Sequence, residues 1–309
     1  MKVNRKTVSK SCTEVNGIMK IIGYGTGATI YRVVKNPSGT SGSIALKMMN
    51  KRPHRSNVLY QRLLKEADIL KRISHPNIVT YMGCLTFKDR KVLLMEELEQ
   101  SLGDYIERLQ GNGRRTMLSE YICRVLQGAS KALDYLHTEK YLLHGDIKSH
   151  NILIKGDVRV VKLCDFGLSI SLRKDGTADV QKYVGTLCWA APEAVDVGPL
   201  TTKADIFSLG MVVYEMLTLK VPFFHYYRIQ KERNSNEFEE ELTESECGCG
   251  LRLLSGLDRE YYSFVEIFRW CTEEGYNARP SAMELLQVLE SSEFSPLRRN
   301  TKTSSLIES

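Results

Sequence analysis

The spacing of apolar positions changes character near Leu98. Before this point the chain contains short β-type runs at residues 17–22, 29–34, 43–49, 81–86 and 91–95. One stretch of helical spacing, residues 60–73, interrupts these runs and places Leu63, Ala67 and Leu70 on one face. The pattern therefore predicts a small sheet domain that contains a single helix.

After Leu98 the apolar positions adopt helical spacing. Residues 121–137 are typical of a buried helix, with an apolar stripe made of Ile122, Val125, Leu126, Ala129, Leu133 and Leu136. We therefore expect an α+β protein, in which the small sheet domain is followed by a larger, mainly helical domain. Three stretches lack either period and are predicted to be flexible: the basic residues 1–14, the acidic residues 225–259, and the Ser/Thr/Arg-rich residues 293–309.

Composition narrows the class of protein. The chain has 309 residues, of which 42% are apolar and 26% charged, as expected of a soluble globular protein. No apolar run approaches the roughly 18 residues that span a bilayer, and no hydrophobic segment follows the basic start, so neither a membrane span nor a secretory signal is expected. The eight cysteines are scattered, which favours free thiols in a cytoplasmic or nuclear protein. Cys247 and Cys249 lack further ligands nearby and are not expected to bind metal.

The net charge of +6 is unevenly distributed. Basic residues gather at 2–10, 51–55 and 298–302, whereas 237–246 is acidic. Solvated surface and tails account for these clusters, and acidic peptides or nucleotide phosphates are the alternative partners. Nothing in the pattern indicates a specific nucleic-acid interface.

The strongest chemical signal is "LLHGDIKSHN" at residues 142–151. In this spacing, Asp146 can accept the proton of a substrate hydroxyl, Lys148 can neutralise a transferred phosphate, and Asn151 can hold Mg²⁺. Asp165 in "CDFG" is the second predicted Mg²⁺ ligand, because this ion prefers carboxylate and amide oxygens. Three such oxygen-bearing side chains at these spacings are hard to obtain by chance.

A glycine-rich stretch, "IIGYGTGATIY", lies between two predicted strands. Gly23 and Gly25 match the first two glycines of a phosphate-binding hairpin, Ala28 replaces the third, and Gly27 precedes it. On its own, a plain hairpin is an equal interpretation. Lys47 follows in "IALKMM" at the spacing expected for a lysine that holds the α- and β-phosphates, with Glu66 as its ion-pair partner.

Three further marks support this interpretation. Met95-Glu96-Glu97-Leu98 indicates a hinge whose backbone can grip an adenine edge, although a simple strand end is the alternative. Glu193 in "AAPEA" is the expected ion-pair partner of Arg279. Asp205 in "KADIFSLG" is expected to hold the backbone of the 142–151 loop.

From about residue 15 to 292 the chain resembles the eukaryotic protein kinase superfamily in motif order and spacing. The resemblance implies a bilobal fold, with a small antiparallel-sheet lobe at 15–95, a hinge at 96–98 and a mainly helical lobe at 99–292. It also implies ATP and Mg²⁺ as cofactors and protein substrates as partners. The implied ATP contacts are Ile22, Gly23, Tyr24, Gly25, Thr26, Gly27, Ala28, Thr29, Ile30, Ala45, Lys47, Met95, Glu96, Leu98 and Leu153.

Within the superfamily, "LLHGDIKS", "IKGD", "CDFG" and "TTKADIFSLG" are similar to the T-LAK cell-originated (PDZ-binding) kinase family, which is MAP-kinase-kinase-like and linked to mitosis. That family carries His-Gly-Asp in this loop, so Gly145 is implied to be a family trait. The position of Lys148, with Thr186 later in the chain, resembles the serine/threonine arrangement, and tyrosine is left open as a further acceptor. The C-terminal serine does not suit a PDZ groove, so PDZ binding is not expected.

Regulation gives two further expectations. Ser295-Pro296 with Arg298 fits a proline-directed kinase site, and an unmodified tail is the equal alternative. In many protein kinases an arginine at the position of Gly145 contacts a phosphate on the activation segment, which here includes Ser171, Thr177 and Tyr183. Gly145 has no side chain to make this contact, although Arg173 or Lys182 could take the place of the arginine. We therefore expect activity without phosphorylation, with order provided by packing or by a partner subunit in a homodimer.

Two alternatives to an active protein kinase stay open. A pseudokinase scaffold would require a missing base, lysine or metal ligand, and Lys47, Asp146, Asn151 and Asp165 are all present. A small-molecule kinase would share the fold, but the Ala-Pro-Glu mark favours a platform for peptides.

Overall fold

The structure is a computed structural model that describes residues 18–25, 27–34, 44–50, 56–87, 90–178, 185–195, 198–222, 256–291 and 294. The predictions for residues 1–14, most of 225–259, nearly all of 293–309, and Thr26, Lys182, Tyr183, Cys247, Cys249 and Ser295 lie outside this part. The chain divides into two compact units, Met1–Lys71 with Thr80–Glu97, and Arg72–Val79 with Leu98–Ser309.

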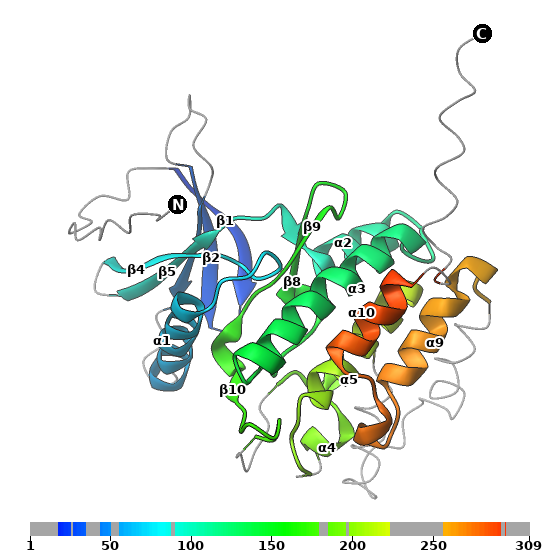
Figure 1. The fold of residues 1–309 in the computed structure, drawn as a ribbon. Coiled ribbons are helices and arrows are strands. Elements are labelled where there is room, and N and C mark those ends of the chain that lie inside the picture. The colour runs from blue at the N-terminus through cyan, green and yellow to red at the C-terminus, as the bar shows by residue number, and fades with distance from the viewer. Residues whose placement is uncertain are drawn as a thin grey trace, which may run out of the picture. The chain divides into compact units, whose positions relative to one another are not determined.

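The first unit contains an antiparallel sheet of five strands in the order β1-β2-β3-β5-β4. The strands are β1 (Ile18–Gly25), β2 (Ala28–Val34), β3 (Ile44–Met49), β4 (Tyr81–Phe87) and β5 (Arg90–Glu96). The helix α1 (Ser56–Arg72) lies beside this sheet (Figure 1). The predicted antiparallel sheet with one helix is therefore confirmed, and α1 begins four residues before the predicted start at residue 60.

The two faces of this sheet have different chemistry. Val33, Leu46 and Val92 form a buried cluster on one face. Because side chains alternate along a strand, their neighbours Ala45 and Lys47 lie on the opposite face. The sequence thus builds one apolar face for packing and leaves the other available for a lysine.

The second unit is mainly helical. Its longer helices are α2 (Leu102–Gly111), α3 (Ser119–Asp134), α5 (Lys203–Thr218), α9 (Tyr262–Cys271) and α10 (Ala282–Glu290), with the short α4 (Pro192–Val195). Short strands flank the predicted catalytic segments: β6 (Gln100–Ser101), β7 (Leu142–Leu143), β8 (Ile152–Lys155), β9 (Val160–Leu163) and β10 (Ile170–Ser171). Figure 1 shows α3 next to α10, and every residue of α5 from Ala204 to Leu217 is buried.

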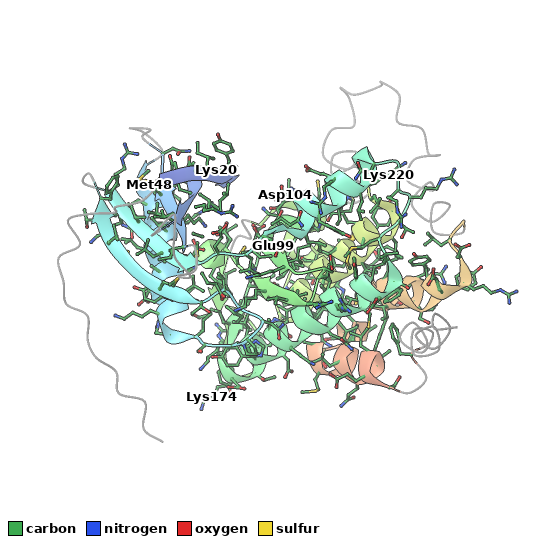
Figure 2. All side chains as sticks on the ribbon, turned by 90° about the horizontal axis from the view of Figure 1, so that it is seen from above. Lys20, Met48, Glu99, Asp104, Lys174 and Lys220 are labelled. Carbon is green, nitrogen blue, oxygen red and sulfur yellow. The ribbon has the colours of Figure 1, made fainter. Side chains whose placement is uncertain are left out.

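Local sequence explains where the helices begin and end. Ser101 and Asp104 form a capping box at the start of α2, where the labelled Asp104 lies in the first turn (Figure 2). Ser281 and Glu284 cap α10 in the same way. The predicted helix at 121–137 is present, but its regular part ends at Asp134 and continues as a π-helical turn, Tyr135–Glu139. Across the described ranges, no helix is long and apolar enough to cross a bilayer.

Candidate functional site

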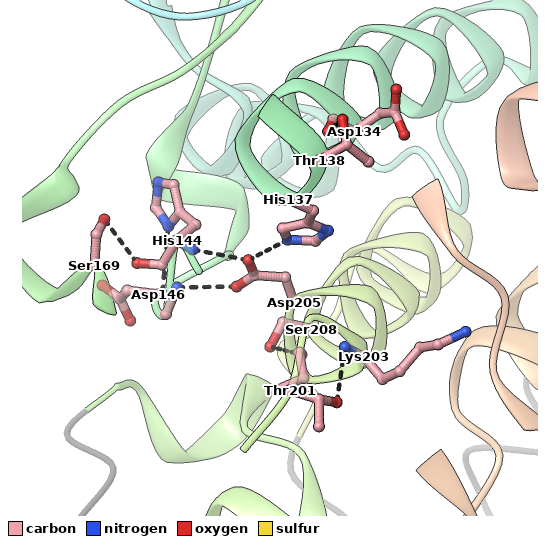
Figure 3. Close-up of polar contacts among 12 residues, drawn as sticks. Asp134, His137, Thr138, His144, Asp146, Ser169, Thr201, Lys203, Asp205 and Ser208 are labelled. Atoms are coloured by element: carbon pink, nitrogen blue, oxygen red, sulfur yellow. Dashed lines mark hydrogen bonds and ion pairs between the residues drawn. The ribbon is translucent and has the colours of Figure 1, made fainter. Parts of the chain in front are cut away.

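The loop between β7 and β8 is held by the buried side chain of Asp205 in α5 (Figure 3). The amide of His144 donates to Asp205 Oδ2 at 2.8 Å, and the amide of Gly145 donates to Oδ1 at 2.9 Å. On the other side of the loop, Ser169 Oγ donates to the His144 carbonyl at 3.1 Å. The predicted role of Asp205 as the holder of this backbone is confirmed.

Asp205 is stabilised as a carboxylate despite complete burial. Burial acts to raise its pKa, but the hydrogen bond from His137 Nε2 at 2.9 Å, nearby His144 and the loop amide lower the pKa below its usual value overall. His137 reaches Asp205 from the π-helical turn at the end of α3. This turn, which the apolar pattern did not predict, therefore supplies a partner to Asp205, the residue that holds the loop.

Gly145 has a backbone conformation that favours glycine. Its φ is +77°, and a Cβ built there would lie 3.0 Å from the carbonyl oxygen of Leu168. A side chain at this position would meet both backbone strain and a close contact. The loop therefore accommodates glycine in place of arginine for a local structural reason.

Both carboxylate oxygens of Asp146 are hydrogen-bonded within the second unit. Oδ1 accepts from the amide and hydroxyl of Thr186 at 3.0 and 2.6 Å. Oδ2 accepts from Asn151 Nδ2 at 2.9 Å and lies 3.0 Å from Lys148 Nζ. Lys148 Nζ also donates to Thr186 Oγ1 at 2.8 Å, so the four side chains form one closed network. The network fixes a carboxylate beside a cation and a hydroxyl.

The predicted metal ligands have suitable donor atoms. Asn151 donates through Nδ2 to the Asp146 carbonyl and carboxylate, which leaves its Oδ1 as the atom for a cation. Asp165 has φ +64°, a left-handed conformation that aspartate adopts at a cost and that often marks a functional position. Within the described part of the chain, no three His, Cys, Asp or Glu side chains gather as a metal site. An Asn–Asp pair offers the amide and carboxylate oxygens that Mg²⁺ prefers, and the ion usually takes water and phosphate oxygens for its other ligands.

In the first unit, Lys47 and Glu66 form a buried ion pair. Lys47 Nζ on β3 lies 2.7 Å from Glu66 Oε2 on α1. Both side chains are at most one-tenth exposed, so water screens the pair weakly. This contact fixes the ammonium of Lys47, which lies on the same face of the sheet as Ala45.

The glycine-rich stretch forms a hairpin between β1 and β2, with a shorter turn than the gap between the two predicted strands. Gly23 and Gly25 lie within β1, and Ala28 is already paired with Gly25 as the first residue of β2. The turn falls at Gly27, which has φ +77° and packs so closely on Leu59 of α1 that a Cβ would lie 2.3 Å from that side chain. The backbone therefore requires glycine at position 27 and not at position 28, which alanine occupies.

The remaining predicted contacts divide between the units. Met95 is buried, and Glu96 is the last residue of β5. The first unit carries Ile22, Gly23, Tyr24, Gly25, Gly27, Ala28, Thr29, Ile30, Ala45, Lys47, Glu66, Met95 and Glu96. The second carries Leu98, Asp146, Lys148, Asn151, Leu153 and Asp165.

Glu215 is a buried acid next to this loop that the sequence did not indicate. Ser149 Oγ donates to its Oε1 at 2.7 Å, and Trp189 Nε1 donates to its Oε2 at 3.2 Å. Burial raises the pKa of Glu215 to about 7, although these two hydrogen bonds act in the opposite direction. The only sequence signal was a glutamate in the apolar stretch of α5.

The raised pKa of Glu215 gives a testable pH dependence. The folded protein binds this proton more tightly than the unfolded chain, so Glu215 reduces stability as the pH rises from about 4.5 to 7. The stability of Glu215→Gln minus that of wild type should therefore increase between pH 5 and 8 by about 2–3 kcal/mol. Urea unfolding at several pH values measures this difference, and a difference that stays constant with pH would contradict it.

Residues 17–289 match the family described as Protein kinase domain. Since the match covers most of the chain, the chain belongs to the protein kinase family, and by family it is an ATP-dependent protein kinase. The sheet with one helix followed by a helical part is the fold expected of this family.

The relatives refine this placement. Human lymphokine-activated killer T-cell-originated protein kinase is 36% identical over 285 residues, which cover 88% of each chain. Serine/threonine-protein kinase TAO1-B of Xenopus laevis is 34% identical over 67% of this chain and 20% of that protein. A putative mitogen-activated protein kinase kinase kinase 7-like protein of Drosophila melanogaster is 28% identical over 89% of this chain and 66% of that protein. The resemblance to the T-LAK cell-originated kinase family is confirmed, whereas this chain spans only a fifth of TAO1-B.

Proposed function

We propose that this protein transfers the γ-phosphate of ATP to serine or threonine hydroxyls of protein substrates. The observation that carries the proposal is the closed network of Asp146, Lys148, Asn151 and Thr186. Family membership and the serine/threonine kinases among its relatives support the same activity.

Each residue of the network has a role that follows from its contacts. Asp146 is the base that accepts the proton of the substrate hydroxyl. Hydrogen bonds to both of its oxygens hold the carboxylate in a fixed orientation for this role. Lys148, 2.8 Å from the Thr186 hydroxyl, supplies positive charge beside the reacting oxygen. Asn151 and Asp165 would hold Mg²⁺, and Lys47, aligned by Glu66, would hold the phosphates. Magnesium-bound ATP supplies the phosphoryl group and part of the charge neutralisation.

A transfer assay tests this function against its alternatives. Purified protein is incubated with labelled ATP, Mg²⁺ and a basic protein, followed by phosphoamino-acid analysis. Label on serine and threonine supports the proposal, and label on tyrosine as well would establish dual specificity. ATP binding without transfer would favour a pseudokinase, and labelling of small molecules alone would favour a metabolite kinase.

Several finer assignments rest on resemblance and sequence pattern. We propose a MAP-kinase-kinase-like role in mitotic or proliferative signalling, in the cytoplasm or nucleus, because that association belongs to the T-LAK cell-originated kinase family. Ser295 is the proposed site of an upstream proline-directed kinase, and homodimerisation is a proposed source of order. The ATP contacts and the lobe boundaries at 15–95, 96–98 and 99–292 are proposed on the resemblance to the protein kinase superfamily.

We expect the dephosphorylated protein to keep its activity within about tenfold, because Gly145 cannot use an activating phosphate. The described activation segment has order of its own: Thr177 pairs with Thr201, and the Ala178 amide donates to the Leu200 carbonyl at 2.8 Å. The Thr177 hydroxyl donates to Asp175 Oδ1 at 2.6 Å, so a phosphate there would lie beside a carboxylate. Phosphatase treatment, mass spectrometry and an immediate peptide assay measure the effect.

The control for this experiment is a mock-treated sample carried through the same steps. A phosphate switch would be established if the activity fell by about 100-fold or more and recovered when Ser171, Thr177 or Tyr183 was rephosphorylated. That result would also remove the interpretation of Gly145.

A further inference from the structure

A row of directly opposed residues crosses the sheet of the first unit. The row consists of Lys20, Arg32, Ala45, Met95 and Tyr81. Figure 2 labels Lys20, which lies on β1 at one end of the row. Directly opposed residues point to the same face of a sheet, so Arg32 shares its face with Ala45 and Met95. Lys47 stands two residues beyond Ala45 and lies on this face as well.

Arg32 connects this face to the end of β5. Its Nε and Nη2 both contact Oε1 of Glu97, the residue that follows the strand. Glu97 stands two residues after Met95, and β3 lies between β2 and β5. The Arg32 side chain must therefore cross β3, where Ala45 presents only a methyl group. The carboxylate side chain is 3% exposed, whereas the arginine side chain is 37% exposed.

The second oxygen of Glu97 makes the pair unusual. Glu97 Oε2 is buried and has no hydrogen-bond partner among the described residues. The contacts of Arg32 with Oε1 are therefore what compensates the buried negative charge of Glu97 among the described residues. A buried carboxylate is stable only when a cation or hydrogen bonds replace water.

The neighbouring carboxylate fastens the same segment to another strand. The amide and hydroxyl of Thr80, immediately before β4, donate to Glu96 Oε1 at 2.7 and 2.6 Å. The amide of Glu96 in turn donates to the Thr80 carbonyl at 3.1 Å. Glu96 thus attaches the end of β5 to the residue before β4. Glu97 attaches the next residue to β2, on the other side of β5.

We propose that the Arg32–Glu97 ion pair positions the end of β5 for nucleotide binding and thereby sets the affinity for ATP. The inference rests on the proposed function, in which Ala45, Lys47 and the backbone at Glu96 face the nucleotide. By fixing Glu97 against β2, the pair holds the hydrogen-bonding groups of this backbone at a constant distance from the row that contains Ala45. Arg32 and Glu97 are positioning residues, and neither takes part in the transfer step.

The unequal burial of the two side chains predicts unequal consequences. Without Arg32, the buried Glu97 charge has no partner, and the segment must rearrange to expose it. Without Glu97, the partly exposed Arg32 can be hydrated with little rearrangement. Arg32→Met should therefore disturb nucleotide binding more than Glu97→Met.

The test measures kcat and the KM for ATP at a saturating concentration of peptide substrate. Arg32→Met should raise the KM about tenfold and Glu97→Met about threefold, with kcat within about twofold of wild type. The exchanged variant Arg32→Glu/Glu97→Arg should return the KM to within about threefold of wild type, because the opposite charges are again adjacent. Arg90→Met is the matched control: Arg90 begins β5 and donates to the Met49 carbonyl at 3.2 Å, so its loss should leave the KM unchanged.

Thermal unfolding of each variant shows whether it is folded at the assay temperature. If Arg32→Met is unfolded, Glu97→Met and the exchanged variant decide the question. An unchanged KM for ATP in both Glu97→Met and Arg32→Met would overturn the inference, and so would a fall in kcat as large as the rise in KM. It would also be overturned if the KM of the exchanged variant were no lower than that of the more impaired single variant. Absence of ATP-dependent transfer by wild type would instead refute the proposed function.

Discussion

Replacing Asp146 by asparagine should lower phosphate transfer by about 10²–10⁴-fold while leaving the affinity for ATP nearly intact. The amide oxygen can still accept from Thr186, which donates to Oδ1 through both its amide and its hydroxyl in the wild type. The amide cannot accept a proton from the substrate, because it is a far weaker base than the carboxylate. Single-turnover transfer to a peptide, together with calorimetric titration of Mg²⁺-ATP, measures the two properties separately.

Asp165→Asn is the matched comparison for this variant. It should also lower transfer strongly, but through loss of an ionised Mg²⁺ ligand, so that the affinity for Mg²⁺-ATP falls as well. A substantial loss of ATP affinity in Asp146→Asn, equal to that in Asp165→Asn, would contradict the separate roles. Retention of near-normal transfer by Asp146→Asn would exclude it as the base.

Much of the fold could be predicted because its signals are local. The strands of the first unit alternate in burial or carry short apolar runs, and α3 carries a continuous apolar stripe, so the residue period defines each element. The motif around Asp146 was equally visible, because its functional side chains lie within six residues of one another on the loop. The ion pair of Arg279 with Glu193 was predicted from motif order and is confirmed.

The contacts that the sequence did not indicate depend on tertiary packing. His137 meets Asp205 only because α3 ends in a π-helical turn, and Glu215 meets Ser149 only because α5 runs beneath the loop. The Arg32–Glu97 pair requires the register of three strands, which a period of two cannot specify. Buried polar partners are therefore the part of the site for which a structure is needed.

Loss of Arg279 should destabilise the protein by about 3–5 kcal/mol, because it removes the partner of a buried carboxylate. The Arg279 side chain is fully buried, and its two terminal nitrogens donate to Glu193 Oε1 and Oε2 at 2.6 and 2.9 Å. Its Nε also donates to the Glu273 carbonyl at 2.7 Å, and the guanidinium lies 4.8 Å from the centre of the Phe207 ring. Arg279→Met retains most of the apolar volume and removes all of these polar contacts. Urea unfolding at pH 7 measures the change.

The exposed pair of Lys131 and Glu290 is the control, since both side chains are about half in solvent. Lys131→Met should change stability by less than about 1 kcal/mol, because water already solvates both charges. Adding Glu193→Leu to Arg279→Met should recover part of the lost stability, because the double variant buries no unpaired charge. If Arg279→Met unfolds at the same urea concentration as Lys131→Met, or if the double variant is less stable than Arg279→Met, the buried ion pair is not what holds these two segments together.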